Sequence, residues 1–265
     1  MFEITAFEVR RRVRGTLYFS VALLAYAALV LAIFPSIKEA AVDIESYIEN
    51  LPPEIQRAFV GEASSYTTIE GFLASEMYQF VFLLVLGMYF AYAAASTVAS
   101  EVENGSIGPL LANPVSRTRV LVGKYLSLVP SIAAVNAVLF AGTYYGTAFI
   151  GEDVSLVDLA TLHALSVPYL LACAGLGMVA SVSFDSARRA QTVGAGGVFA
   201  MFLVDAATFD TDYEWLGDMA FSRYFDTAEI LVDADVDWAG TAYLLVAAVA
   251  LVVVSAELFE RADLG

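Results

Sequence analysis

The sequence contains very little of what disulfide-bonded proteins, metalloproteins and hydrolases use. Its 265 residues include one cysteine, Cys173, and one histidine, His163. One cysteine cannot form an intramolecular disulfide, and these two residues together do not supply the ligands of a zinc site. The sequence also lacks the G-x-S-x-G and H-E-x-x-H patterns of hydrolases. We therefore expect no catalytic residue, no cofactor and no metal in this chain.

Charged residues are also scarce, and most of them are acidic. Only 16% of the residues are charged and 59% are apolar, whereas soluble domains contain about 25% charged and about 45–50% apolar residues. A soluble domain of this composition would have too few polar residues to cover its surface, so we expect a membrane protein.

The sign of the charge excludes one class of partner. There are 29 acidic and 13 basic residues, which gives a net charge of −16. Phosphate binding needs Lys and Arg, so nucleic acid is not an expected partner, whereas membrane lipid is. An acidic excess on water-exposed surfaces suits high salt, and we therefore hypothesise a halophilic archaeal source.

Six apolar runs are long enough to cross a bilayer, which takes about 20 mostly apolar residues. The fifth run is the weakest, because it contains three glycines and Asp205. The predicted fold class is all-α, a polytopic membrane protein with six transmembrane helices in one domain, 1–265. The predicted spans are residues 15–35, 77–100, 125–150, 159–182, 191–209 and 239–256.

The basic residues lie mainly on one side of these spans. Segments 1–14, 101–124, 183–190 and 257–265 together hold ten of the 13 basic residues and eight of the 29 acidic residues. Cytoplasmic segments are enriched in Lys and Arg. We therefore predict a multi-pass cell-membrane protein with cytoplasmic N- and C-termini and an acidic outer surface.

The segments outside the spans also contain helical patterns. Residues 2–14 mix apolar and basic side chains and predict a short amphipathic helix in the cytoplasmic membrane interface. The uncharged run that follows is longer than the apolar core of a signal peptide, so we expect a retained first span. Residues 36–76, around Pro52-Pro53, and residues 210–238 predict short helices on the outer side.

The segment between the second and third predicted spans is the most informative part of the chain. Glu101 and Glu103 follow the second span, and Asn104-Gly105 predicts a turn. Asn113-Pro114 then interrupts the apolar run 107–111. From these residues alone, two interpretations stay open: a short helix held against the membrane face, or an ordinary loop whose basic residues only fix the topology.

The sequence of this segment, EVENGSIGPLLANPVSRTRVLVGK, resembles the pattern that follows the second span in ABC-2 type transporter permeases. Ser106 stands where threonine is usual, and Gly108-Pro109 replaces positions that are usually charged. The six predicted spans and the basic amphipathic start extend the resemblance over the whole chain. The matching residues are Glu101, Glu103, Gly105, Leu110, Leu111, Pro114, Val115, Ser116, Arg117, Gly123 and Lys124.

This resemblance implies a permease subunit of an exporter that works as a dimer, with itself or with a paralogous permease. Such permeases pair with separate ABC ATPase subunits, which bind the ATP. Residues 101–119 would dock in a cleft of the ATPase and form the coupling element. Glu101 and Glu103 would set its angle, Leu110 and Leu111 would be its buried contacts, and Arg117 would contact acidic or backbone groups of the ATPase.

The chain itself is not expected to bind ATP. Gly123-Lys124 ends like a phosphate-binding loop, but Thr118 occupies the position of the first glycine and Tyr125 the position of Ser or Thr. Two alternatives to the permease stay open. One is a membrane scaffold or sensor of the same architecture. The other is an ATP-independent secondary carrier, for which charged or broken helices are expected at mid-membrane in both halves.

Several polar and small residues within the spans have a structural or a functional interpretation. Asp205 either lines a polar path or marks where the fifth span reaches water. His163 is interpreted as an interfacial residue, and Asn136 as a residue that hydrogen-bonds a neighbouring helix. The fourth and fifth spans also contain glycines that could act as hinges, but we favour a role in close helix packing. They are Gly175, Gly177, Gly194, Gly196 and Gly197.

Overall fold

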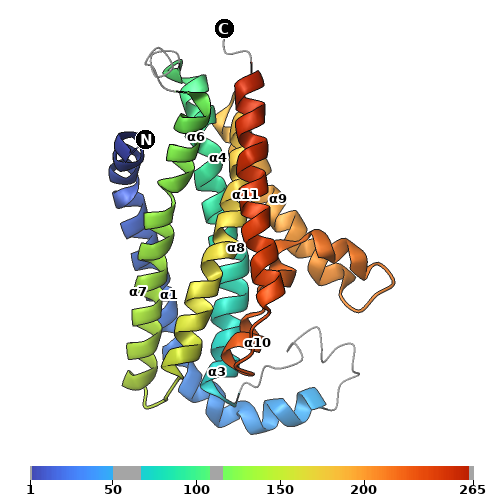
Figure 1. Ribbon diagram of the computed structural model, residues 1–265. Helices are drawn as coiled ribbons and strands as arrows, with labels where there is room; N and C mark the ends of the chain where they lie inside the picture. The colour runs from blue at the N-terminus through green and yellow to red at the C-terminus, as the bar shows by residue number, and fades with distance from the viewer. Residues whose placement is uncertain (1, 50–66, 108–115, 263–265) are drawn as a thin grey trace.

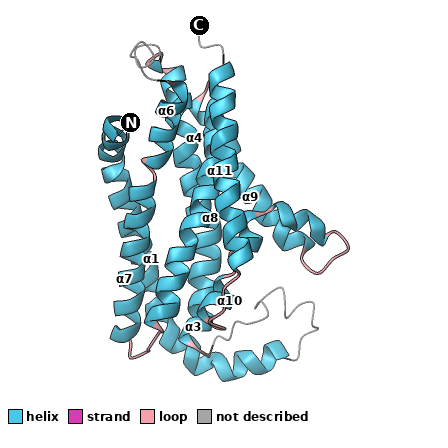
Figure 2. Cartoon of the chain, viewed as in Figure 1, coloured by secondary structure: helices cyan, strands magenta, loops and turns pink. Residues whose placement is uncertain are grey.

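The computed structural model describes residues 2–49, 67–107 and 116–262, and its regular structure in these ranges is entirely helical (Figure 2). Six helices in these ranges are long and apolar enough to cross a membrane. The predicted all-α class with six spanning helices is therefore confirmed. The spanning helices are α1 (Phe2–Glu49), Ile69–Glu103, Arg117–Phe149, α8 (Leu156–Ser183), α9 (Ala187–Thr208) and α11 (Trp238–Arg261).

The first helix extends beyond the predicted span at both ends. α1 runs through Gly15 and Pro35, the bounds of the predicted first span. Residues 2–14 are helical as predicted, but they form the first turns of α1 and not a separate helix. Buried or half-buried positions recur at helical spacing on both sides of Gly15, so one continuous face of α1 packs on the bundle. The last part of α1, blue in Figure 1, runs across the lower end of the bundle.

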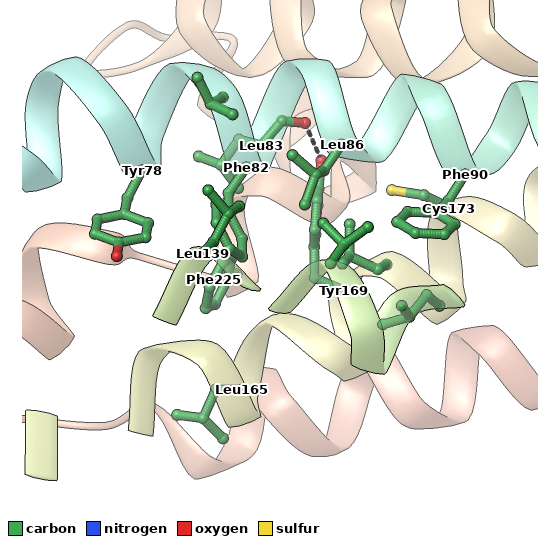
Figure 3. Close-up of a cluster of buried hydrophobic side chains, with 14 of the residues drawn as sticks. Tyr78, Phe82, Leu83, Leu86, Phe90, Leu139, Leu165, Tyr169, Cys173 and Phe225 are labelled. Carbon is green, nitrogen blue, oxygen red and sulfur yellow. Dashed lines mark hydrogen bonds between the residues drawn. The ribbon is translucent and has the colours of Figure 1, made fainter. Parts of the chain in front are cut away.

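The second spanning helix changes geometry along its length. Where its π-helical part ends, the amide of Gly87 donates to the carbonyl of Phe82, five residues earlier. At this point the hydroxyl of Tyr169, from α8, donates to the carbonyl of Leu83 (Figure 3). A Cβ at Gly87 would lie 2.7 Å from that hydroxyl oxygen, so the glycine leaves room for it. The three parts are α3 (Ile69–Phe72), the π-helix η1 (Leu73–Leu86) and α4 (Gly87–Glu103).

The third spanning helix is divided into α6 (Arg117–Leu126) and α7 (Val129–Phe149). Pro130 lies at the start of α7. A proline has no N–H to donate and disfavours the helical conformation of the residue before it, so the helix is interrupted here. Ser116 begins α6, because its Oγ accepts a hydrogen bond of 3.3 Å from the amide of Arg119.

α8 lies at the centre of the bundle and contacts α4, α7, α9 and α11. α1 and α7 pair on one side, while α9 leans away on the other (Figure 1). α8 approaches α4 closely at Gly177, where a Cβ would lie 2.1 Å from the carbonyl oxygen of Ala91. A Cβ at Gly194 of α9 would lie 3.3 Å from the same oxygen, whereas at Gly196 it would meet nothing within 4 Å. Gly177 and Gly194 therefore serve close helix packing.

A buried polar group joins the second, third and fourth spanning helices. Nδ1 of His163 lies 2.9 Å from Oδ1 of Asn136, and its Nε2 lies 3.2 Å from the hydroxyl of Tyr78. Ser166 donates to the same Asn136 oxygen at 2.8 Å. The helix–helix hydrogen bond predicted for Asn136 is confirmed. The interfacial interpretation of His163 is wrong, because its side chain is buried between helices with both ring nitrogens bonded.

Short helices follow α9, in the region 210–238 where the sequence predicted one. Carboxylates begin two of the helices there: Asp226 Oδ1 accepts from the amide of Ala228 at 2.8 Å, and Asp237 Oδ1 from that of Ala239 at 2.9 Å. The Pro52-Pro53 break predicted within 36–76 lies outside the described residues. The short helices are η2 (Glu214–Met219), η3 (Phe221–Tyr224) and α10 (Thr227–Leu231).

Candidate functional site

The 101–119 segment begins in the last turn of α4 and ends in the first turn of α6. Both lie at the upper end of the bundle in Figure 1, where α1 begins and α11 ends, which we call the terminal end. Gly105 stops α4 with φ +67°, a left-handed conformation that favours glycine. The amide of Ser106 bonds the carbonyl of Glu101 at 2.9 Å, and that of Gly105 bonds Val102 at 3.0 Å. This pattern turns the chain sharply away from the helix axis.

Glu103 connects the end of α4 to the beginning of α9. Its Oε2 accepts a hydrogen bond of 3.0 Å from the amide of Ala187, the first residue of α9. Its Oε1 lies 3.5 Å from Oγ of Ser186. The first amides of a helix lack partners within the helix and carry partial positive charge, so a carboxylate there is stabilising.

Arg117 connects the beginning of α6 to the end of α11. Its NH1 donates to the carbonyls of Phe259 at 3.0 Å and Ala262 at 2.7 Å, with a longer contact of 3.4 Å to Glu260. The hydroxyl of Thr118 also donates to the Glu260 carboxylate. The last carbonyls of a helix carry partial negative charge, so the guanidinium stabilises this end of α11.

Lys124 is buried in α6 and connects it to α4 and α1. Its Nζ lies 2.7 Å from Oε1 of Glu8 and 2.6 Å from Oε1 of Glu101. The side chains of Lys124, Glu8 and Glu101 are 1%, 6% and 16% exposed. Charged groups are seldom this buried unless they are paired. We call these three residues the Lys124 cluster.

The structure brings together only part of the predicted site. Glu101, Glu103, Gly105 and Arg117 lie at the terminal end. The three charged residues bond other helices of their own chain, whereas Gly105 is exposed. Leu110, Leu111 and Pro114 lie outside the described residues. Glu8 was missed by the sequence analysis; the available signal was an isolated acid in a basic segment, on the same helix face as Arg12 and Thr16.

Asp205 lies away from these residues, near the end of α9. Its Oδ1 lies 3.3 Å from Nε of Arg223, and its Oδ2 accepts a hydrogen bond of 2.6 Å from Ser222. Arg223 also pairs with Glu214 at 3.1 Å and with Asp218 at 2.7 Å. Burial alone would lower the pKa of Arg223, but the bond to Asp218 and the neighbouring negative charges outweigh it and raise the pKa. We call Asp205, Glu214, Asp218 and Arg223 the Arg223 cluster.

The described residues contain no candidate metal site. No three His, Cys, Asp or Glu side chains in these ranges are grouped so that they could hold a metal ion. The only cysteine, Cys173, is buried in α8. At the terminal end, charged side chains are bonded to the ends of other helices. Such bonds can transmit a displacement of one helix to another.

The family described as "ABC-2 family transporter protein" matches residues 4–264 of this chain. The chain belongs to this family. The resemblance to ABC-2 type transporter permeases that rests on residues 101–124 is thereby confirmed at the level of the family. The six apolar helices agree with a multi-pass membrane protein of this kind.

A curated relative extends this comparison. The uncharacterized protein YhcI of Bacillus subtilis (strain 168) is 26% identical in an alignment that covers 59% of this chain and 52% of the relative. The chain thus spans about half the length of the relative that it matches. A halophilic archaeal source stays a hypothesis based on the acidic composition.

Proposed function

We propose that this ABC-2 protein is the permease subunit of an ATP-driven exporter, in which the 101–119 segment docks on a separate ABC ATPase. In this proposal the subunit works as a dimer in the cell membrane, with both termini cytoplasmic. ATP is bound and hydrolysed by the partner, and this chain contributes the path and the mechanical connection.

The observation that carries the proposal is the bonding of both flanks of the segment. Glu103 is bonded to the first residue of α9, and Arg117 to the last carbonyls of α11. Charged groups at helix termini typically contribute about 0.3–1 kcal/mol, and up to about 2 kcal/mol when partly buried. A displacement of the segment by a closing ATPase would therefore move α9 and α11, in addition to α4 and α6, which the segment connects.

The docking surface in this proposal consists of the apolar pair Leu110 and Leu111 within a polar and basic rim. Transient interfaces of this kind have a few buried apolar anchors surrounded by charged groups. Ser116 and Arg119, on the rim, are exposed. The acidic excess of the chain lies mainly elsewhere, since segment 101–124 contains two acids and three basic residues.

The double substitution Leu110→Asp/Leu111→Asp tests the proposal. The tagged permease is purified from its native membranes, and the co-purified ABC ATPase is quantified. We expect the double variant to insert normally but to lose the ATPase. Asn104→Asp is the matched control, because it adds a negative charge to the same segment without removing an apolar contact, and it should retain the ATPase.

Two results would contradict this assignment. If the wild-type protein captures no ABC ATPase, a scaffold or an ATP-independent carrier explains the chain better. If the double variant captures as much ATPase as the wild type, the docking surface lies elsewhere.

A further inference from the structure

The Lys124 cluster lies where three helices meet at the terminal end. Glu8 comes from the first turns of α1, Glu101 from the last turn of α4, and Lys124 from the last turn of α6. The two Nζ–Oε1 distances are nearly equal, 2.7 and 2.6 Å. One ammonium group therefore bonds carboxylates from two other helices at the same time.

Hydrogen bonds of α1 reinforce this connection. Oγ1 of Thr5 donates to the carbonyl of Gly123, next to Lys124, at 3.1 Å. NH1 of Arg12 donates to the carbonyl of Ala93 in α4 at 3.4 Å. The first turns of α1 thus bind both helices that flank the 101–119 segment. The formal charges of Arg12, Lys124, Glu8 and Glu101 sum to zero.

A buried ion pair is a poor source of stability, because removing two charges from water costs about as much as their attraction returns. Apolar residues of similar size would fill this space at least as well. The charges add a penalty for independent movement, because a helix that moves alone leaves a buried charge without its partner. The cluster therefore favours joint movement of α1, α4 and α6 over independent movement.

We infer that Lys124 and Glu8 are positioning residues, which hold the amphipathic start of α1 to the 101–119 segment so that the two move as one unit. This inference rests on the proposed docking of the ATPase. It adds α1 to the helices that receive the displacement, and it assigns a role to Glu8, which lies outside the ABC-2 sequence pattern.

Two variants separate positioning from stability. Glu8→Gln removes one charge of the cluster and keeps the size of the side chain. The triple variant Glu8→Met/Glu101→Met/Lys124→Met replaces the cluster with apolar side chains, which commonly preserve stability. Lys38→Met is the matched control, since it removes a lysine of α1 that forms a 2.6 Å ion pair with Glu152 away from the terminal end.

The first measurement is the ATP turnover of the co-purified ATPase with each permease, beside the melting temperature. We expect the triple variant to keep the ATPase and the melting temperature, and Glu8→Gln to keep the ATPase but to melt at a lower temperature, because it removes one partner of a buried cluster. In both variants permease-stimulated turnover should fall roughly ten-fold, within the range of coupling between sites. Lys38→Met should change turnover by less than about two-fold. Wild-type turnover in the triple variant would show that the cluster is only structural and overturn the inference.

The second measurement does not depend on the ATPase. Spin labels at Ala6 and Ser106, both exposed, report the distance between α1 and the segment in a background with Cys173→Ala. We expect one narrow distance distribution in the wild type and a broad one in both variants. If the distribution stays narrow, the inference fails. If the wild type captures no ATPase, the proposed function fails instead, and this measurement alone decides the role of the cluster.

Discussion

Two charge clusters at different places in the bundle contain the same kinds of side chain but differ in burial and in the elements that they join. In the Lys124 cluster, one lysine that is 1% exposed bonds two carboxylates that are 6% and 16% exposed. In the Arg223 cluster, one arginine that is 18% exposed pairs with carboxylates that are 18%, 53% and 61% exposed. The first joins three long helices, whereas the second holds η2 and η3 to the end of α9.

The difference in burial determines what each cluster can do. Water and salt screen the exposed pairs, so each is worth little and its loss is tolerated. The buried cluster is screened much less, and removing one partner leaves a charge that nothing compensates. Of the two clusters, only the Lys124 cluster can therefore couple the movement of one helix to that of another. It lies at the end where we propose that the ATPase docks.

The comparison first requires that the two clusters lie on opposite sides of the membrane. Cysteines introduced at Ser116, Asp153 and Asp212, all exposed, can be labelled in intact cells with an impermeant thiol reagent. We expect all-or-none labelling, with reaction at Asp153 and Asp212 and none at Ser116. The native Cys173 is buried and should give little background. Labelling at Ser116 from outside would reverse the proposed orientation.

The two lysine ion pairs should differ strongly in stability. Lys124→Met leaves Glu8 and Glu101 buried without their cation, and we expect a loss of about 3–5 kcal/mol in the free energy of unfolding. Lys38→Met removes an exposed pair of similar length and should cost less than about 1 kcal/mol. Thermal or denaturant unfolding in detergent measures both, and equal losses would remove the distinction between buried and exposed pairs.

Salt should affect only the Arg223 cluster. The screening length falls from about 10 Å at 0.1 M salt to about 3 Å at 1 M. We expect Arg223→Gln to lower the melting temperature at low salt by more than it does at high salt. The destabilisation by Lys124→Met should be nearly independent of salt. A strong salt dependence for Lys124→Met would mean that water reaches that cluster.

The smallest expected effect is a pH dependence at Glu229, in α10. Burial raises the pKa of Glu229, and the negative charges of Asp226, Asp235, Asp237 and Asp233 raise it further. Because the folded pKa lies above the unfolded value, the folded protein binds more protons between the two values, and stability rises as the pH falls through the folded pKa.

The measurement for Glu229 is the melting temperature of the wild type and of Glu229→Gln from about pH 7 to about pH 5. The wild type should gain stability relative to the variant as the pH falls. Parallel curves for the two proteins would show that the acidic neighbours do not act on Glu229.

Much of the fold could be predicted because lipid imposes a simple length and polarity rule on each span. The rule locates apolar runs but not helix ends, and for this reason the predicted span 15–35 does not give the bounds of α1, Phe2–Glu49. His163 was misjudged for a related reason. Its partners, Tyr78 and Asn136, come from two other helices and become neighbours only in the folded bundle.

The candidate site was only partly predictable. The ABC-2 pattern identified Glu103, Arg117 and Lys124, but a pattern cannot give the partner of a side chain. Ala187, Phe259 and Glu8, which these three residues bond, lie 84, 142 and 116 positions away in the sequence. Such contacts depend on how the helices are assembled, and no local rule of spacing or propensity gives them.

The most direct test of the account is site-specific photo-crosslinking in native membranes. A photoreactive amino acid is placed at Ser106, beside the proposed docking surface, and in a second protein at Asp212, beyond the end of α9. The account predicts that Ser106 crosslinks to an ABC ATPase subunit and that Asp212 does not. An ATPase crosslink from Asp212 and none from Ser106 would contradict the central claim that the 101–119 segment receives the ATPase.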